Sequence, residues 1–159
     1  WAFAVWDQHD RSLFLSRDRF GVKPLFYRYT EKYLLFASEL KAFMALPGYL
    51  QPAFDKEMIA HMKNVESIER TLLKGVKNLL AGHCLRLQYG RSPKIRKWWK
   101  TIDHLQQSPK MFGDQVEQYR ELFFDACKIR MRSDVPTASC LSGGLDSSSV
   151  VRVINNFII

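Results

Sequence analysis

The chain has 159 residues, of which 47% are hydrophobic and 13% aromatic, and its formal net charge is +8. This length fits one ordinary domain or parts of two, and the aromatic content argues against a disordered chain. The positive charge suits anionic ligands such as nucleotides or nucleic acid. The three cysteines form no Cys-x-x-Cys pair, so neither a disulfide framework nor a zinc site is supported. Because no apolar run approaches the roughly 20 residues of a membrane span, we expect a soluble cytoplasmic protein without a membrane partner.

The first part of the sequence predicts a run of β-strands. Apolar segments at 1–6, 13–15, 25–29 and 33–37 are separated by polar turns, and the last two flank residues 30–32 as the strands of a hairpin would. Because these segments are continuously apolar rather than alternating, we expect a sheet that is covered on both faces.

Two short helices are predicted after these strands. Ser38 is the expected N-cap of a helix over 39–46, which Pro47 ends. Asp55 is the expected N-cap of the second helix. One face of that helix is assigned to core packing and contains Met58, Ile59 and Met62.

Residues 86–100 form a basic stretch that contains no acidic residue. The basic residues are Arg86, Arg91, Lys94, Arg96, Lys97 and Lys100, and the aromatic residues between them are Tyr89, Trp98 and Trp99. A basic patch with aromatic residues is one footprint of nucleic-acid binding. A solvated hairpin around Gly90, entered by a strand over 83–87 and with its tryptophans packed inward, is the commoner arrangement. We adopt the hairpin, and nucleic acid is not an expected partner.

The composition changes after residue 100. Residues 101–113 are polar and contain a proline and a glycine, which is typical of an interdomain linker. We therefore expect one domain to occupy residues 1–100 and another to occupy 114–159. Helical spacing begins at Asp114, which is the expected N-cap. A short apolar strand over 138–141 follows that helix.

A glycine-rich stretch with the sequence Ser-Gly-Gly-Leu-Asp-Ser-Ser occupies 142–148, between the predicted strand and an apolar-periodic helical segment. Adjacent glycines let the backbone turn tightly and approach a ligand. The free N–H groups of a helix's first turn suit an anion. Ser142, Ser147 and Ser148 add hydroxyl donors, and Asp146 offers a hard oxygen ligand for magnesium. The stretch therefore predicts a site for a magnesium-bound polyphosphate.

This stretch is not a Walker A loop, because no lysine occurs between Arg132 and the end of the chain. Backbone amides, hydroxyls and one carboxylate fit the pyrophosphate that leaves when a substrate attacks the α-phosphate of ATP. The purely structural alternative is a Gly-Gly turn followed by a serine-capped helix.

Five blocks of the sequence, taken in order, resemble glutamine-dependent asparagine synthetases. They are residues 1–7, 17–25, 36–42, 130–136 and 141–149. The resemblance implies the α+β sheet portion of an Ntn-hydrolase glutaminase domain. It also implies that the first helix-strand-loop-helix of an α/β adenine-nucleotide (PP-loop) domain follows, and that the chain is truncated at both ends. The implied enzyme hydrolyses glutamine, adenylylates aspartate with ATP and magnesium, and lets ammonia displace AMP to give asparagine.

The resemblance also implies roles for individual residues. The ATP- and pyrophosphate-binding residues carried over by position are Cys140, Leu141, Ser142, Gly143, Gly144, Leu145, Asp146, Ser147 and Ser148. Cys140 and Leu141 would act through backbone and packing, and Asp146 would be the magnesium ligand. The expected partners are the small-molecule substrates ATP, aspartate and glutamine, and a homodimer is the assembly that we consider.

The resemblance implies further residues that we expect outside this chain, and others that we expect to have a structural role in it. In the family, the nucleophilic cysteine and the glutamine-binding residues precede the strand at 1–6, so we expect the chain by itself to catalyse neither half-reaction and to fold poorly. Charged residues cluster around the turn after the second strand, and we expect them to hold the sheet rather than to catalyse. They are Arg17, Asp18, Lys23 and Glu39.

Three alternatives stay open at this point. The same two domains could act on another acceptor carboxylate, as in β-lactam-forming or peptide-modifying synthetases. A tRNA-modifying enzyme could carry the same ATP loop. A non-catalytic scaffold derived from the enzyme is the third alternative, and the intact glycine pair and Asp146 argue against it.

Overall fold

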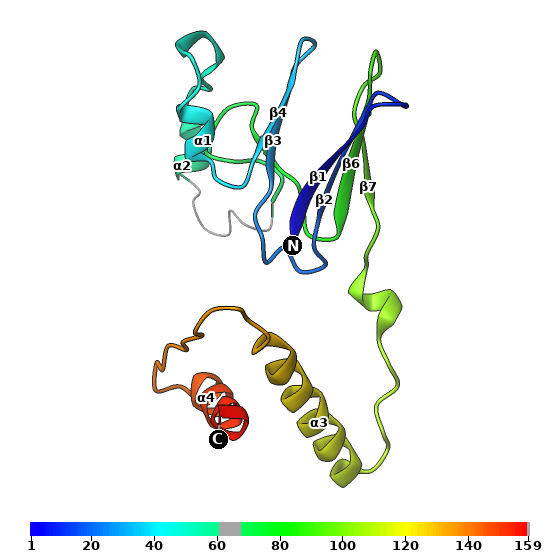
Figure 1. The fold of residues 1–159 in the computed structure, drawn as a ribbon, viewed down its shortest axis with the longest axis vertical. Helices are drawn as coiled ribbons and strands as arrows, with labels where there is room; N and C mark the ends of the chain where they lie inside the picture. The colour runs from blue at the N-terminus through cyan, green and yellow to red at the C-terminus, as the bar shows by residue number, and fades with distance from the viewer. Residues whose placement is uncertain (61–67, 159) are drawn as a thin grey trace. The chain divides into compact units, whose positions relative to one another are not determined.

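The computed structural model describes residues 1–60 and 68–158, so the predicted position of Met62 lies outside the described residues. The chain divides into two units, Trp1–Leu105 and Gln106–Ile159. Each unit is described by itself, and Figure 1 traces both.

Two antiparallel sheets form the first unit. The four-stranded sheet has the order β1-β2-β6-β7 and the three-stranded sheet has the order β4-β3-β5. The strands of the first sheet are β1 Ala2–Asp7, β2 Ser12–Arg17, β6 His83–Gln88 and β7 Lys94–Lys97. The strands of the second sheet are β3 Phe26–Tyr29, β4 Leu34–Ala37 and β5 Lys77–Asn78. The predicted strands and the hairpin joining β3 to β4 are therefore confirmed.

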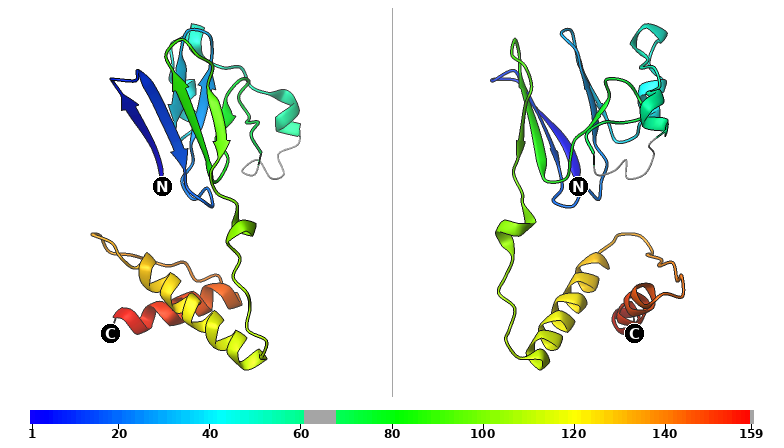
Figure 2. Two further views of the ribbon diagram at one scale, coloured as in Figure 1. Left: turned by 90° about the vertical axis from the view of Figure 1, so that its right-hand side faces the viewer. Right: turned by 180° about the vertical axis from the view of Figure 1, so that it is seen from behind.

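The core of this unit lies between the two sheets, which face each other as separate layers in Figures 1 and 2. Leu15 of β2 and Leu85 of β6 are cross-strand partners, and both are 0% exposed. Tyr27 of β3 and Leu79 pack against them from the second sheet and the segment after β5. Side chains of alternate residues point to one face of a strand, so this row fixes the register of the first sheet.

The sheet is not covered on both faces, and that prediction was wrong for β1. Phe3, Val5 and Trp6 of β1 are 43%, 52% and 55% exposed. An antiparallel sheet needs one packed face only, so continuous apolar character does not prove double coverage.

The helical segment after β4 is shorter than predicted. Helix α1 spans Lys41–Met44, and its N-cap is Leu40 rather than Ser38, without a side-chain cap. A short 3₁₀ turn, Gly48–Leu50, follows. Phe43 is held by a second apolar cluster with Leu73 and Val76. Packing of Phe43, rather than a serine cap, therefore explains where this helix forms.

Helix α2, Lys56–Ala60, begins where the sequence predicts. The Asp55 carboxylate accepts a hydrogen bond from the Met58 backbone N–H at 3.4 Å, which confirms Asp55 as the cap. Met58 is buried as predicted for core packing, whereas Ile59 is largely exposed. The two residues lie on different sides of the helix, so the predicted apolar face is only partly formed.

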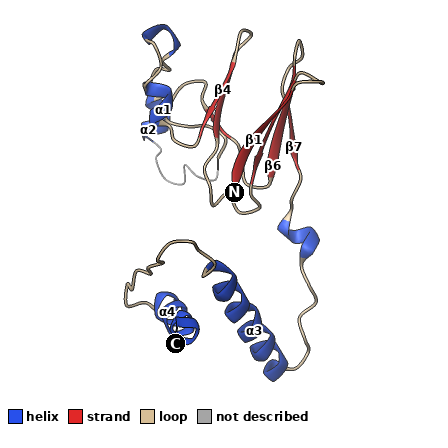
Figure 3. Cartoon of the chain, in the orientation of Figure 1, coloured by secondary structure: helices blue, strands red, loops and turns tan. Residues whose placement is uncertain are grey.

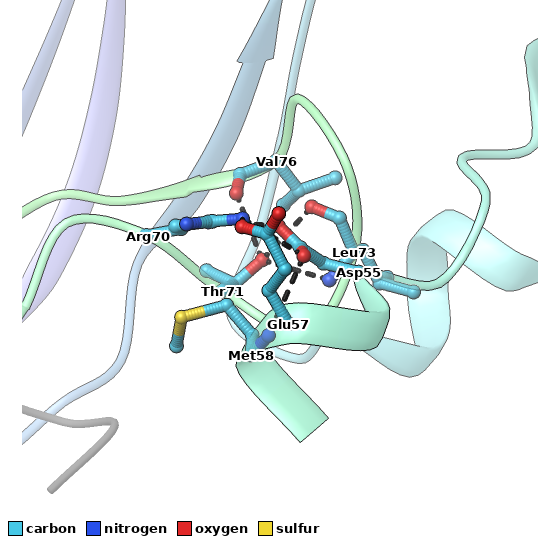
Figure 4. A network of polar contacts seen from close by, with 7 residues as sticks. All are labelled: Asp55, Glu57, Met58, Arg70, Thr71, Leu73 and Val76. Atoms are coloured by element: carbon cyan, nitrogen blue, oxygen red, sulfur yellow. Dashed lines mark hydrogen bonds and ion pairs between the residues drawn. The ribbon is translucent and has the colours of Figure 1, made fainter. Parts of the chain in front are cut away.

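Arg70 ties the start of α2 to the segment before β5, as Figure 4 shows. Its guanidinium donates to both carboxylate oxygens of Asp55, at 2.8 and 2.9 Å, and to Glu57 at 2.7 Å. The hydrogen bond from Arg70 is the main reason that the pKa of Asp55 lies below its usual value. The capping carboxylate therefore stays ionised where it accepts the helix N–H.

Thr71 forms a second anchor beside this pair (Figure 4) and is 1% exposed. Its hydroxyl donates to the Val76 carbonyl at 2.8 Å and accepts from the Leu73 N–H at 3.2 Å. These bonds close the tight turn at 71–76 that leads into β5.

We expect Thr71→Val to lower the free energy of unfolding by about 1–3 kcal/mol, because a buried N–H and a buried carbonyl lose their partner. Urea denaturation followed by circular dichroism measures the change. Thr137→Val, at an exposed position, is the control and should change stability by less than about 0.5 kcal/mol. Equal stability of the two variants would contradict the anchoring role.

The second unit contains two long helices, α3 Phe112–Arg130 and α4 Leu145–Ile158. They contact each other, and the rings of Phe124 and Phe157 meet edge to face at 6.5 Å. No helix within residues 1–60 and 68–158 has the length and apolar character that crossing a membrane would need.

Two predictions for this unit were wrong. Asp114 is not the N-cap of α3, because the helix begins two residues earlier and Met111 is the cap. Asp114 lies in the first turn, where a carboxylate favours the helix dipole without capping. The strand over 138–141 is not formed, because the described part of this unit holds no strand with which it could pair.

Candidate functional site

The predicted phosphate-binding loop lies at the N-terminus of α4. Leu145 is the first helical residue, and the Ser148 N–H donates to the Gly144 carbonyl at 3.1 Å, which starts the helical hydrogen bonds. The N–H groups before Ser148 precede that series, so helix geometry gives them no carbonyl partner within α4, and they suit an anion. The structure thus confirms the predicted turn-to-helix order, although an extended loop replaces the strand before it.

Two serines hold the shape of this loop. The hydroxyls of Ser142 and Ser147 are 3.0 Å apart, and the Ser147 hydroxyl also donates to the Gly144 carbonyl at 3.1 Å. The hydroxyl of Ser142 therefore faces the first turn of the helix across the two glycines. Ser148, by contrast, is placed one residue further into α4.

Gly143 has a φ of +82°, in the left-handed region, whereas Gly144 has no such φ. A Cβ on Gly143 would meet open space, so the need for glycine is conformational rather than steric at this position. The turn brings the loop backbone to the surface in front of α4.

The loop is open to solvent. Leu141 and Leu145 are 63% and 83% exposed, and Cys140 and Asp146 are exposed as well. Within residues 1–60 and 68–158, no three His, Cys, Asp or Glu side chains meet in a metal-binding group. A magnesium ion at Asp146 would therefore take its other oxygen ligands from phosphate and water, as magnesium commonly does. The residues of the loop fit this kind of site.

We expect Gly143→Ala to weaken pyrophosphate binding by the full-length protein, because the free loop of the variant would leave the left-handed conformation and binding would have to restore it, at a cost of about 1–2 kcal/mol. That cost corresponds to a roughly 5- to 30-fold loss of affinity in isothermal titration calorimetry. Gly113→Ala is the matched control, since a Cβ there meets open space and its φ is ordinary. Unchanged affinity of the Gly143 variant would show that anion binding does not need this turn.

Arg17 organises the charged turn of the first unit. Its Nε donates to the Lys23 carbonyl and one Nη donates to the Gly21 carbonyl, both at 2.8 Å. The other Nη donates to the Asn78 side chain at 2.7 Å and to the Leu79 carbonyl at 2.8 Å. Arg17 belongs to the first sheet and Asn78 to the second, so one buried side chain links both sheets to the turn.

Asp18 holds the same turn from the other side. Its carboxylate accepts backbone N–H groups of Phe20, Val22 and Lys23 at 3.0–3.1 Å, and the Trp1 nitrogen lies at 3.3 Å. Burial by itself raises the pKa of Asp18, but these donors outweigh burial and lower it to about 2. The contacts agree with the structural role that we expected for Arg17 and Asp18.

We expect Asp18→Asn to destabilise the protein by about 1–3 kcal/mol at pH 7, because an amide oxygen replaces a carboxylate facing several N–H groups. The lowered pKa of Asp18 means that its stabilising effect is present above about pH 4 and is lost as the pH falls towards 2. Urea titrations across this range should show the two proteins converging at low pH. A constant difference in stability down to pH 2 would contradict the ionic contribution.

Sequence reasoning missed several residues that organise the first unit. Asn78 and Thr71 act through buried hydrogen bonds to distant segments, and Arg70 acts through the Asp55 pair. No spacing or motif identifies such partners, because they come together only when the sheets pack.

Two models of known protein families match successive parts of the chain. A family model described as a glutamine amidotransferase domain matches residues 1–99. The chain belongs to this glutamine amidotransferase family. A second family model, described as asparagine synthase, matches residues 118–157 and includes the loop at the start of α4. The two matches in this order identify the chain as a segment of a protein of the glutamine-dependent asparagine synthetase type.

Curated relatives match nearly the whole amidotransferase chain. Asparagine synthetase [glutamine-hydrolyzing] 3 of Bacillus subtilis is 35% identical over 156 residues, which is 96% of this chain and 25% of that protein. Putative asparagine synthetase [glutamine-hydrolyzing] 2 of Methanocaldococcus jannaschii is 35% identical over 99% of this chain and 31% of its own length. Amidase chyE of Penicillium rubens is also 35% identical, over 96% of this chain and 23% of that protein. The chain thus spans about a quarter of the length of these relatives.

Proposed function

We propose that this chain is part of a glutamine-hydrolysing enzyme that uses ATP to convert a carboxylate, aspartate in the first place, into its amide. The observation that carries the proposal is the order of the two family matches, with an open, glycine-turned helix N-terminus inside the second. In the proposed enzyme, the amidotransferase domain releases ammonia from glutamine, and the synthetase domain consumes that ammonia in forming the amide.

We assign residues 1–100 to the glutaminase-like domain, of the Ntn-hydrolase type, and 101–113 to the linker. Residues 114–159 would start a synthetase domain of the PP-loop type. The matched ranges 1–99 and 118–157 support this division. The 3₁₀ turn Thr101–His104 forms the last part of the first structural unit, since His104 stacks on Trp99 at 3.7 Å. The part of the linker outside the first unit would then begin after residue 105.

In the proposed reaction a carboxylate oxygen of aspartate attacks the α-phosphorus of ATP, and the bond to the bridging oxygen breaks. Pyrophosphate leaves with that electron pair. Ammonia then attacks the acyl carbon, AMP departs with the former carboxylate oxygen, and a proton is lost from nitrogen to give asparagine.

The loop residues act on the leaving pyrophosphate. The free N–H groups at the start of α4 and the hydroxyls of Ser142, Ser147 and Ser148 would donate to its oxygens as negative charge develops there. Cys140 and Leu141 would contact the nucleotide through backbone and packing, and Leu145 would contribute its backbone at the first position of α4. Magnesium, held by Asp146, would supply neutralising positive charge.

The identity of the acceptor carboxylate distinguishes two candidate functions. Amidase chyE is as similar to this chain as asparagine synthetase 3 is, each at 35% identity. A second candidate is therefore a related enzyme with the same ATP chemistry and another acceptor. Pyrophosphate release measured with aspartate and with other carboxylates distinguishes the two candidates, since the acceptor is the substrate on which release depends.

We expect Asp146→Ala in the full-length protein to lower acceptor-dependent pyrophosphate release by about 10²-fold or more. Without the Asp146 carboxylate, the magnesium that neutralises the leaving pyrophosphate would be held less well. Glutamine hydrolysis, in the other domain, should stay within about twofold. Asp125→Ala, an exposed acid on α3, is the matched control and should affect neither activity. Unchanged pyrophosphate release in the Asp146 variant would overturn the assignment of the metal ligand.

A further inference from the structure

A small basic hollow lies on the β6–β7 hairpin and shares no residue with the loop before α4 or with the Arg17 turn. Its volume is about 220 Å³, and its lining residues are Arg86, Gln88, Arg91, Ser92 and Lys94. Three of these side chains carry positive charge and two offer neutral polar groups. We define these five residues as the hairpin hollow.

The strand register forces like charges together at this hollow. Arg86 of β6 and Lys94 of β7 are direct cross-strand partners, so their side chains project from the same face of the sheet. Arg96, two residues along from Lys94, lies on that face as well. Like charges directly opposite each other in an antiparallel pair destabilise the sheet. The arrangement therefore favours an anion that would bring these cations together.

Carboxylates compensate little of this charge. Arg86 donates to Asp10 at 3.2 Å, but both side chains are more than half exposed, so the pair is weak. The sequence from 86 to 100 contains no acidic residue. Arg91 and Lys94 are exposed, with their charged groups accessible to a ligand. An unbound hollow thus keeps an excess of positive charge.

The aromatic residues near the hairpin indicate which kind of anion fits. Trp98 stacks on Trp1 at 5.5 Å, and the guanidinium of Arg11 covers the Tyr89 ring at 3.8 Å. Trp99 stacks on His104 and lies under the guanidinium of Arg19. Binding of single-stranded nucleic acid relies on aromatic faces that are available for bases. Because a protein group already covers at least one face of each of these rings, a compact anion fits the hollow better than an RNA strand.

We propose that the hairpin hollow binds a compact polyphosphate, in which several phosphate groups meet Arg86, Arg91 and Lys94 together. Ser92 and Gln88 would donate further hydrogen bonds to phosphate oxygens. This site belongs to the amidotransferase unit and needs no magnesium, because lysine and arginine supply the positive charge. It is independent of the proposed amide-forming reaction and would persist if that proposal failed.

Isothermal titration calorimetry of the full-length protein with inorganic tripolyphosphate, in EDTA and low salt, tests the site. The Arg91→Gln/Lys94→Gln variant should bind at least about tenfold more weakly than the wild type, since two of three cations are lost. Lys97→Gln/Lys100→Gln removes the same charge outside the hollow, from the end of β7 and the segment after it, and should stay within about twofold. The loop at 142–148 is intact in both variants, so its contribution to binding is the same.

Equal loss of affinity in both double variants would overturn the proposal, because it would reduce the effect to overall charge. No loss in either variant would overturn it as well. A third result would also overturn it. In that case a single-stranded RNA oligonucleotide binds the wild type more tightly than tripolyphosphate does, and only the Arg91→Gln/Lys94→Gln substitutions weaken RNA binding. Matching melting curves for all proteins should verify that these exposed substitutions leave the fold intact.

Discussion

The buried guanidinium of Arg17 is the contact on which the first unit most depends. It reaches from the end of β2 to the Asn78 side chain and the Leu79 carbonyl, and so ties the two sheets together at one end of their shared core. The same group fixes the turn after β2 through two carbonyls, and Asp18 fixes that turn through its N–H groups. An arginine can do this because its planar group carries five donors in a rigid geometry. The charged side chains of Arg17 and Asp18 thus stabilise the fold of this turn.

The proposed binding loop of the second unit is exposed, in contrast to the buried Arg17 contact of the first unit. It is shaped by two serine hydroxyls and a left-handed glycine, with the free end of α4 behind it. The proposed site would bind an anion through backbone N–H groups, whose donation is strongest where water is excluded. A separate hollow of about 450 Å³ is lined by residues of α3, α4 and the connection between them, including Cys127, Ala138 and Val150. The helices thus present the loop at an exposed surface, where the proposed ligand would bind.

Much of this structure could be predicted from the sequence. Apolar segments predicted β1 to β4 and β6, Asp55 marked the start of α2, and the glycine pair marked the start of α4, because each signal is local. The two-residue strand β5 carries no such signal and was not predicted. The strand at 138–141 and the Ser38 cap were wrong, because their formation depends on neighbouring strands and on the packing of Phe43. The Asn78 and Thr71 contacts join residues distant in sequence or closed within a tight turn, which periodicity does not detect. The roles of the loop residues remain predictions that rest on the family resemblance.

In the proposed reaction, transfer of AMP activates a carboxylate before ammonia attacks it. Mass spectrometry of the products formed by the full-length protein from ATP, glutamine and carboxyl-¹⁸O-labelled aspartate follows that transfer. We predict one ¹⁸O atom in each AMP released, in equal amount to the asparagine formed, and none in pyrophosphate. Unlabelled AMP, or ADP together with ¹⁸O-labelled inorganic phosphate, would contradict the account.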